Sequence, residues 1–500
     1  MNNILGIILP FISRTIIIYT LGNEYLGLGG LFTSIINVIS ISELGFGAAV
    51  SYILYKPIAE NDEEKVCAIL IFTRKCFLVI GIVVFVAGIA IMPFLKSLIS
   101  GDVPNGINVY LLYVFYLINV VSSYVMFSYK RILFSANQRY DIETNIASFT
   151  LIAQYIVQII VLILLKNYYL YVIIVPIATI ANNLLCQKIT KKMYPRFVCK
   201  GNISKEEVTL LKQKVSGSFF SKLGDTVYLS VDNIVISAIF GLLVLGKYSN
   251  YYYIITSLVA LFAIVHNTLR PIIGNCIVTE NKDINFDRFL KLNNIYFWIS
   301  ALCTCCLLCL YQDFIFVWLD EESMFSFGMV VLFAIYFFVG RLYGMPALFV
   351  EAAGLWWESR FVALIAAAVN LILNITLSYT IGLEGVLISS IASSLGVTFV
   401  GRNMVLFKYY FSNKERNKYL ISTLKMLCAA TVCISATFFV STTIYATNFL
   451  TLILKGVLVV LAFAVLYFTL HIKNKSSREI WSLAISFIGL DKIVKKIKKH

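Results

Sequence analysis

Long apolar runs recur along the whole chain, and they constrain its fold more than any other feature. A helix needs about 20 consecutive apolar residues to cross a hydrocarbon core of roughly 30 Å. Hydrophobic residues make up 60% of the chain and charged residues 13%, whereas soluble domains are roughly 45 to 50% apolar. Because the apolar residues form continuous runs and do not alternate with polar ones, a β-barrel is excluded. The sequence therefore predicts an all-α polytopic membrane protein.

Apolar windows predict about fourteen transmembrane helices. Their approximate ranges are 3–20, 29–55, 77–99, 108–133, 144–165, 168–187, 217–240, 250–278, 293–318, 327–350, 361–381, 384–407, 422–446 and 449–471. The segment Leu21–Gly27 lies between the first two helices, and its glycines Gly22 and Gly27 suit a tight exposed turn. We therefore expect the chain to reverse there.

Basic residues gather in every second loop, which predicts how the helices are oriented. The segments rich in Lys and Arg are 56–75, 130–139, 188–214, 280–291, 408–425 and the tail from 473. The alternate loops, 22–28, 100–107, 312–326 and 382–385, are mostly acidic or neutral. By the positive-inside rule both termini are cytoplasmic. The net charge of +15 then faces the anionic lipids of the inner leaflet and not nucleic acid, and the basic amphipathic stretch 480–499 lies on that leaflet.

An internal repeat predicts how the helices are grouped. Gly241 and Gly246 repeat the spacing of Gly22 and Gly27, LFVEAAGLWWE (348–358) loosely repeats LFSANQRYD (133–141), and the helices that follow carry the amide pairs Gln154/Gln158 and Asn370/Asn374. The repeat indicates two six-helix lobes with the same orientation in the membrane. The predicted parts are an N-terminal lobe (1–190), a basic cytoplasmic linker (191–215), a C-terminal lobe (216–410), two additional transmembrane helices (411–472) and a cytoplasmic tail (473–500).

Several sequence runs resemble one transporter family. They are RTIIIYTLG with EYLGL, ELGFG and YKPIAEND (within 14–62), GDVPNGINVYLLYVFYLINVVSSY (101–124), FSANQRYDI (134–142) and KKMYPRFVCKG (191–201). These runs are similar to those of the Wzx-type polysaccharide repeat-unit flippases of the multidrug/oligosaccharidyl-lipid/polysaccharide (MOP) superfamily. The resemblance implies a MATE-like arrangement of helices and alternating access.

The same resemblance implies a cargo, partners and a location. The cargo is an undecaprenyl-diphosphate-linked oligosaccharide, moved from the cytoplasmic to the outer leaflet of the bacterial cytoplasmic membrane for capsule, O-antigen or exopolysaccharide synthesis. Polysaccharide polymerases and glycosyltransferases are the implied protein partners. Two alternatives stay open, an ion-coupled multidrug exporter of the same superfamily and a membrane scaffold without transport.

Ionisable residues inside the predicted spans are the candidate site, because charge in a membrane is costly and usually functional. The candidates for binding an anionic headgroup are Arg14, Lys222, Arg270 and Arg341. The candidates for ion coupling are Glu43, Asp225, Asp232, His266 and Glu351. Amides that fit sugar hydroxyls are Gln154, Asn182 and Asn370.

Each candidate also has a purely structural interpretation. Lys222 and Asp225 are three residues apart and suit an ion pair within one helix. His266 suits a hydrogen-bonded structural role, the amides suit contacts between helices, and Arg402 suits a side chain that reaches the cytoplasmic interface.

The cysteines and the known catalytic motifs point away from an enzyme. Four of the eleven cysteines, Cys303, Cys305, Cys306 and Cys309, lie in one apolar segment without a second CxxC or a nearby His, so we interpret them as core residues and expect neither a disulfide framework nor a metal site. The sequence has no P-loop, Gly-rich nucleotide site or HExxH motif. The longest predicted external segment, 312–326, is too short for a catalytic domain. We expect a transporter without a cofactor.

Overall fold

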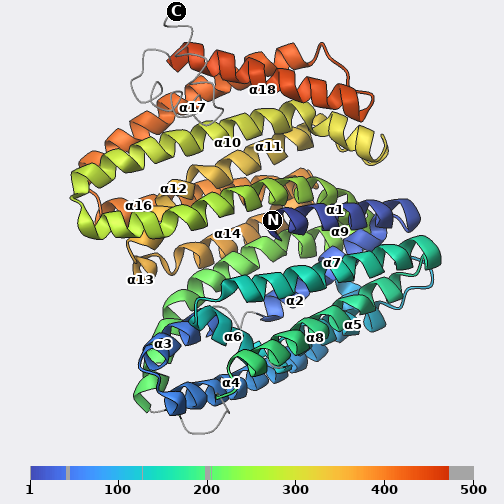
Figure 1. Cartoon of the computed structure of the whole chain (residues 1–500). Coiled ribbons are helices and arrows are strands. Elements are labelled where there is room, and N and C mark those ends of the chain that lie inside the picture. The colour runs from blue at the N-terminus through green and yellow to red at the C-terminus, as the bar shows by residue number, and fades with distance from the viewer. Residues whose placement is uncertain (1, 41–45, 127, 197–202, 204, 472–500) are drawn as a thin grey trace, which may run out of the picture. The chain divides into compact units, whose positions relative to one another are not determined.

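The computed structural model describes residues 2–40, 46–126, 128–196, 203 and 205–471, and helices dominate these ranges (Figure 1). Ten of the described helices are long and apolar enough to cross a membrane, or eleven if α5 and α6 form one bent span. The protein is therefore a multi-pass membrane protein, as predicted. The predicted tail helix and residues 197–202 and 204 of the basic linker lie outside the described residues.

Fourteen spans are not reproduced, for reasons that the helix bounds make clear. The expected spans 217–240 and 250–278 belong to one element, α9 (Lys205–Thr279). The first expected span, 3–20, corresponds to α1 (Asn2–Thr20), whose described apolar part, Leu5–Thr20, is not among the ten. The second expected span comprises two short helices, on either side of residues 41–45.

Contacts divide the chain into two compact units, 1–260 with 356–389, and 261–355 with 390–500. We call them unit 1 and unit 2. Unit 1 contains α1 (Asn2–Thr20), α2 (Asn23–Ile39), α3 (Phe46–Ala59), α4 (Glu63–Ile91), the 3-10 helix Met92–Leu98, α5 (Val109–Val125), α6 (Ser128–Ala136), α7 (Tyr140–Leu165), α8 (Tyr168–Met193), the first part of α9, α13 (Trp356–Ser359) and α14 (Val362–Ile381). Within it, α8 packs against α5 and α7, and α7 packs against α1 (Figure 1).

Unit 2 is organised around α10 (Lys282–Trp318). Its other helices are the last part of α9, α11 (Phe327–Leu342), α12 (Gly344–Ala352), α16 (Val400–Tyr409), α17 (Asn413–Ser441) and α18 (Phe449–His471), while α15 (Glu384–Ser393) is shared between the units. The helix α10 packs against α11, α17 and α18. Cys305, Cys309 and Cys433 are buried in the apolar core of these helices beside Phe463, so they have the structural role that their apolar context predicts.

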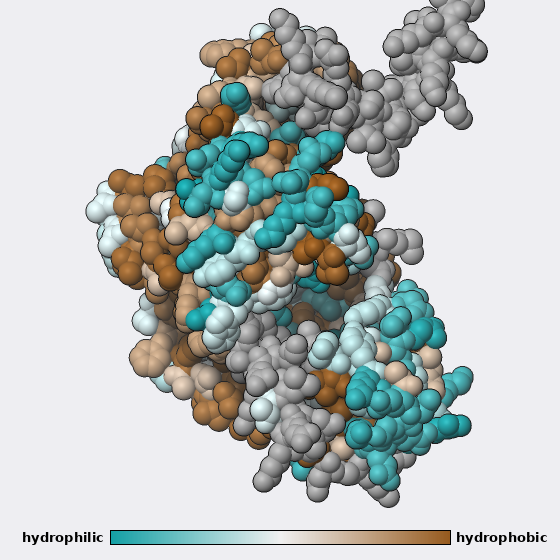
Figure 2. Space-filling view, turned by 90° about the vertical axis from the view of Figure 1, so that its left-hand side faces the viewer, coloured by the Kyte–Doolittle hydropathy of each residue, from teal (hydrophilic) through white to brown (hydrophobic). Residues whose placement is uncertain are grey.

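The surface separates hydrophobic flanks from hydrophilic helix ends. Along α4, Val79, Ile82, Val83 and Val86 are exposed at the spacing of one helical face, which is the arrangement expected where lipid covers a helix. Figure 2 shows the side of the molecule at the left of Figure 1, and hydrophilic residues gather in places on it. The helices therefore present apolar sides to a bilayer and polar ends to water.

The break in α9 corrects the prediction of two separate spans, 217–240 and 250–278. Helical geometry is interrupted only at Gly241, whose φ of 84° and ψ of 177° suit a glycine. The matching reversal at the other repeat is equally short: α1 ends at Thr20, Gly22 has φ 114° and ψ 169°, and α2 begins at Asn23. Gly27 was expected in this turn, but it lies inside α2. The two repeated turns therefore have the same backbone form.

The rest of the repeat also has matching local structure. Gln138 and Gly354 have φ values of 59° and 71° and end α6 and α12 in the same way. The amide pairs form hydrogen bonds within their helices, from Gln154 Nε2 to Gln158 Oε1 at 3.2 Å and from Asn374 Nδ2 to Asn370 Oδ1 at 3.4 Å. The two six-helix lobes that the repeat predicts, 1–190 and 216–410, stay a prediction. The compact units of the structure are divided at other residues.

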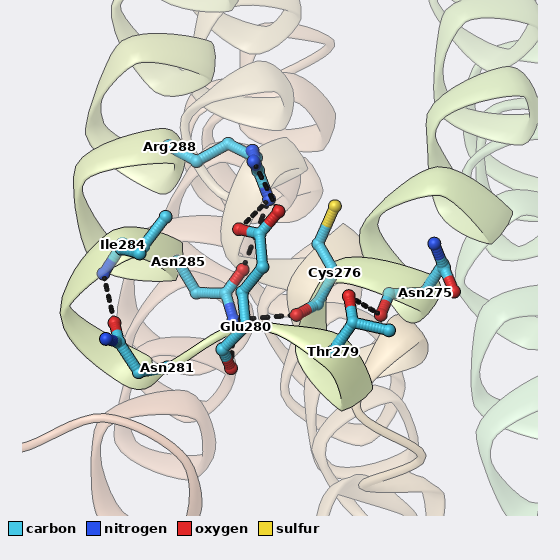
Figure 3. Close-up of polar contacts among 8 residues, drawn as sticks. All are labelled: Asn275, Cys276, Thr279, Glu280, Asn281, Ile284, Asn285 and Arg288. Carbon is cyan, nitrogen blue, oxygen red and sulfur yellow. Dashed lines mark hydrogen bonds and ion pairs between the residues drawn. The ribbon is translucent and has the colours of Figure 1, made fainter.

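The turn between α9 and α10 is closed by side chains (Figure 3). Asn285 is buried, and its Nδ2 donates to the carbonyl oxygens of Cys276 at 3.1 Å and Glu280 at 3.4 Å. The Arg288 guanidinium pairs with the Glu280 carboxylate at 2.7 Å, and Asn281 caps α10 by accepting from the Ile284 N–H. Side chains and backbone thus satisfy the Cys276 carbonyl in the last turn of α9 and the Glu280 carbonyl that follows it.

We expect Asn285→Ala to destabilise this turn by about 1 to 3 kcal/mol, because the buried Asn285 amide no longer donates to the carbonyls of Cys276 and Glu280. Thermal unfolding of the purified protein in detergent measures the change. Asp287→Ala is the matched control, since Asp287 is exposed and pairs only with Lys291 one turn away. Equal melting temperatures for the two variants would contradict the role assigned to Asn285.

Candidate functional site

Arg14 lies on α1, and its contacts with the described residues are all with neutral groups. Its Nε donates to Asn250 Oδ1 at 2.8 Å, and its Nη2 donates to Ser249 Oγ. The guanidinium also lies 5.3 Å from the centre of the Tyr253 ring. In the described part of the chain no carboxylate forms an ion pair with Arg14. The charge of this intramembrane arginine is therefore solvated by an amide, a hydroxyl and an aromatic ring, and an anion would compensate it better.

Asn250 connects Arg14 to a third helix. Its Nδ2 donates to Asn23 Oδ1 at 2.9 Å, while its Oδ1 accepts from Arg14. Asn250 is fully buried, and both of its amide ends are used. The sequence analysis did not identify Asn250 and Ser249 as site residues. They are the two polar residues that precede three tyrosines in SNYYY (249–253), three residues after the repeated glycine Gly246.

Asp232 lies in a buried polar cluster formed by α9, α14 and α15. The side chain is 6% exposed, and its Oδ1 accepts from Asn374 Nδ2 at 2.5 Å. Asn370 joins the cluster through Asn374 and donates to Ser389 Oγ at 3.5 Å. Asn374 Oδ1 and Ser378 Oγ are buried without a hydrogen-bond partner among the described residues. The cluster thus combines a carboxylate with two unused oxygens.

In unit 2, Arg270 and Glu351 form an ion pair of 3.5 Å, with side chains 48% and 21% exposed. His266 lies close enough to both, and to Arg341, to interact electrostatically. Arg341 lies over the rings of Phe262 and Phe337 at 5.7 and 5.9 Å. It also hydrogen-bonds the Tyr296 hydroxyl, while its Nε is buried without a partner in the described part of the chain. His266 therefore has one carboxylate and two arginines near it, and the described ion pair of that carboxylate is with Arg270.

The remaining predicted residues are not brought together. Lys222 and Asp225 are exposed on the first part of α9, and Glu43 lies outside the described residues. Asn182 accepts from Thr150 of α7 at 3.3 Å, and Gln158, the partner of Gln154, donates to the Tyr171 carbonyl at 2.9 Å. These contacts between helices fit the structural interpretation of the amides.

Three charged residues were misjudged or missed from the sequence. Asp313 was expected in an external loop, but it lies in α10 and accepts from Lys455 Nζ of α18 at 2.7 Å. Lys455 was not a candidate at all, and it is 5% exposed. Arg402 was expected to reach the interface, yet it is buried, because α16 packs against α12. Hydropathy does not report which side of a helix is covered.

A cavity of about 250 Å³ lies in unit 1 where α3, α6 and α8 end and α4 begins. Its lining residues include Asn61, Asn137 and Tyr194. Glu63 and Arg196 also line it and form an ion pair of 3.6 Å. No residue predicted to bind cargo or ions lines this cavity.

Comparison with known proteins bears on the fold. No protein-family profile matches the chain, and no curated protein matches it by sequence. Among solved structures, the lipid II flippase MurJ in an inward closed conformation has 15% identity, a TM-score of 0.65, and coverage of 94% of this chain and 100% of that one.

Two further solved structures are similar. A multidrug resistance MATE family transporter in an inward-facing conformation has 16% identity and a TM-score of 0.60, covering 80% of this chain and 96% of that one. A MOP superfamily transporter from Pyrococcus furiosus, whose binding pocket is described as of reverse polarity, has 14% identity and a TM-score of 0.53, covering 81% and 93%. The chain therefore has the all-helical fold of MOP superfamily transporters.

Proposed function

We propose that this protein is a flippase that moves undecaprenyl-diphosphate-linked oligosaccharide repeat units to the outer leaflet by alternating access. The observation that carries the proposal is the set of contacts around Arg14 and Arg341. Both arginines lie within apolar helices, and the contacts described for both are neutral. A diphosphate offers such cations charge-assisted and bidentate hydrogen bonds, which are roughly twice as strong as neutral ones. Sequence resemblance to Wzx-type flippases supports the sugar part of the cargo.

Export of cationic drugs is the second candidate, because MATE family transporters share the fold. The arginines argue against it. An organic cation gains from a carboxylate and is repelled by an unpaired guanidinium. In unit 2 the carboxylate of Glu351 already pairs with Arg270 and leaves Arg341 uncompensated. Intramembrane charge is costly and usually marks a substrate or ion pathway, which favours a transporter over a scaffold without transport.

The proposal includes a location and partners. The Lys and Arg bias of the loops supports a cytoplasmic membrane protein with both termini inside. Anionic lipids of the inner leaflet would contact the basic helix ends, and glycosyltransferases and a polymerase would act before and after the flipping step. None of these roles needs a cofactor or a nucleic acid.

A liposome experiment tests the proposed cargo. We expect the purified protein to expose fluorescent undecaprenyl-diphosphate-linked oligosaccharide to the outer leaflet faster than empty liposomes do, and to leave the distribution of a labelled organic cation unchanged. Dithionite quenching of the leaflet-exposed fluorophore measures the rate. Movement of the cation alone would contradict the flippase and favour the exporter.

Asp232 is the coupling residue that we propose among the five candidates. Its buried carboxylate and the unused oxygens of Asn374 and Ser378 suit a proton or Na⁺. We expect Asp232→Asn to remove the response of flipping to an imposed ion gradient, because the amide does not take up a proton and has no negative charge to hold Na⁺. Separate pH and Na⁺ gradients across the liposomes identify the ion. Asp225→Asn, on the exposed side of the same helix, is the control; an undiminished gradient response in Asp232→Asn would refute the assignment.

A further inference from the structure

The two repeated glycine turns contact each other through the same pair of positions. A Cβ on Gly27 of α2 would lie 2.1 Å from the Leu242 carbonyl oxygen, and a Cβ on Gly246 of α9 would lie 2.0 Å from the Asn23 carbonyl oxygen. Asn23 follows Gly22 as Leu242 follows Gly241. Each turn thus gives a carbonyl to the other and receives one, the reciprocal pattern of a two-fold contact.

These contacts require glycine and tie two distant segments together. A real Cβ does not approach an oxygen closer than about 3 Å, so any side chain at Gly27 or Gly246 would separate the helices. Gly241 also lies against the Ser100 carbonyl, and Ser237 Oγ donates to the Leu98 carbonyl at 2.7 Å. We call the six residues Gly22, Asn23, Gly27, Gly241, Leu242 and Gly246 the turn seal. The positive-inside rule puts this end of unit 1 outside the cell.

The turn seal is linked by hydrogen bonds to Arg14. Asn23, a member of the seal, accepts from Asn250 at 2.9 Å, and Asn250 accepts from Arg14 at 2.8 Å. Ser249, the second acceptor for Arg14, also donates to the Gly246 carbonyl at 3.0 Å. One hydrogen-bond route thus runs from the guanidinium through Asn250 to Asn23 of α2, and the other runs through Ser249 to Gly246 of α9. A ligand that displaces these partners of Arg14 therefore changes hydrogen bonds to residues of the turn seal.

We propose that the turn seal closes the outer end of unit 1 and that Asn250 is the positioning residue that couples its opening to cargo at Arg14. This inference rests on the proposed function, because it takes the cargo to be a diphosphate. Phosphate oxygens compete with Asn250 Oδ1 and Ser249 Oγ for the guanidinium, and the charge-assisted bonds are stronger. Once Arg14 turns to the phosphate, Asn250 loses its fixed orientation and its bond to Asn23 weakens. The seal then opens on the side where the cargo leaves.

A buried residue inside the seal reports its opening. Leu245 has no exposed surface and lies between Leu242 and Gly246, so a cysteine there reacts with a maleimide only when the helices separate. A membrane-impermeant maleimide added outside cells measures the rate, above the labelling of the chain without Leu245→Cys. We expect Gly27→Ala to raise this rate about fivefold or more, because its Cβ forces the backbones apart. Gly30→Ala is the matched control on α2, since its Cβ meets nothing within 4 Å.

Two substitutions of Asn250 test the coupling. Asn250→Ala removes the bond to Asn23 without adding bulk, and we expect faster labelling even without cargo. Asn250→Asp gives Arg14 a carboxylate partner, which holds the guanidinium against a phosphate. In proteoliposomes, undecaprenyl diphosphate should accelerate labelling of the parent about fivefold and leave Asn250→Asp unchanged.

The outcomes separate the seal from the proposed function. Equal labelling of the parent, Gly27→Ala and Asn250→Ala, each present in the membrane at normal abundance, would overturn the seal. If undecaprenyl diphosphate accelerates the parent and Asn250→Asp equally, the coupling through Asn250 is wrong. If the seal variants behave as expected but the parent moves no lipid-linked oligosaccharide, the proposed function fails and the seal stands.

Discussion

Replacing Arg14 or Arg341 by alanine should reduce flipping of lipid-linked oligosaccharide at least tenfold while the protein stays folded in the membrane. Each arginine would supply charge-assisted hydrogen bonds to the diphosphate, and bonds to charged groups contribute about 1.5 to 3 kcal/mol each. The described partners of both arginines are neutral, so their removal leaves no carboxylate buried alone. Flipping rate and membrane abundance, measured together, check both statements.

Three variants sharpen this result. Arg14→Lys should recover only part of the rate, because lysine keeps the charge but loses the bidentate fork. Arg270→Ala should lose flipping and some abundance, since Glu351 is then left without its partner. Lys56→Ala changes an exposed basic residue outside the candidate site and should have no effect. Normal flipping in Arg14→Ala and Arg341→Ala would remove the anionic-cargo mechanism.

Breaking the Lys455–Asp313 ion pair should have the largest effect on stability. Lys455 is 5% exposed, so Lys455→Met leaves the Asp313 carboxylate without its partner among apolar helices. Loss of one partner from a buried pair costs about 3 to 5 kcal/mol, whereas replacing both partners by apolar residues is often neutral. We expect Lys455→Met to lower the melting temperature sharply and Lys455→Met with Asp313→Leu to restore most of it.

The exposed pair Lys291–Asp287 in the same unit is the control for this cycle. Its side chains are 48% and 67% exposed, and we expect Lys291→Met to change the free energy of unfolding by less than about 1 kcal/mol. Thermal unfolding of the parent, Lys455→Met, Asp313→Leu and their double variant in one detergent gives the coupling energy. A double variant no more stable than Lys455→Met would show that the residues act separately.

The sequence predicted the class of fold because hydropathy reports how much apolar surface a segment carries. The expected spans 168–187, 361–381 and 449–471 correspond closely to α8, α14 and α18. Hydropathy does not report close packing, and this caused the errors. Gly27 was assigned to a turn by residue type, whereas the structure uses it where the backbone of α9 approaches α2. The break at Gly241 was taken for a loop for the same reason.

Charge within the apolar spans predicted part of the candidate site, and the structure adds the neutral residues that contact these charges. Charge inside a span identified Arg14, Asp232 and Glu351, which have specific polar partners in the structure. The neutral partners Asn250 and Asn374 carry no charge signal, and only their position beside a charged group makes them part of a site. Lys455 was missed because an ion pair between helices 142 residues apart leaves no local pattern in the sequence.

The single-residue break in α9 also limits how the length of this protein can vary. Most connections between membrane helices tolerate insertions, because a loop absorbs the extra residues. At Gly241 there is no such loop, and helix resumes at the next residue. One residue inserted between Gly241 and Gly246 would rotate every later side chain of α9 by about 100°. Asn250 would then no longer face Arg14 and Asn23, while Asp232, before the break, would keep its partners. Related chains should therefore differ here by substitution and almost never by length.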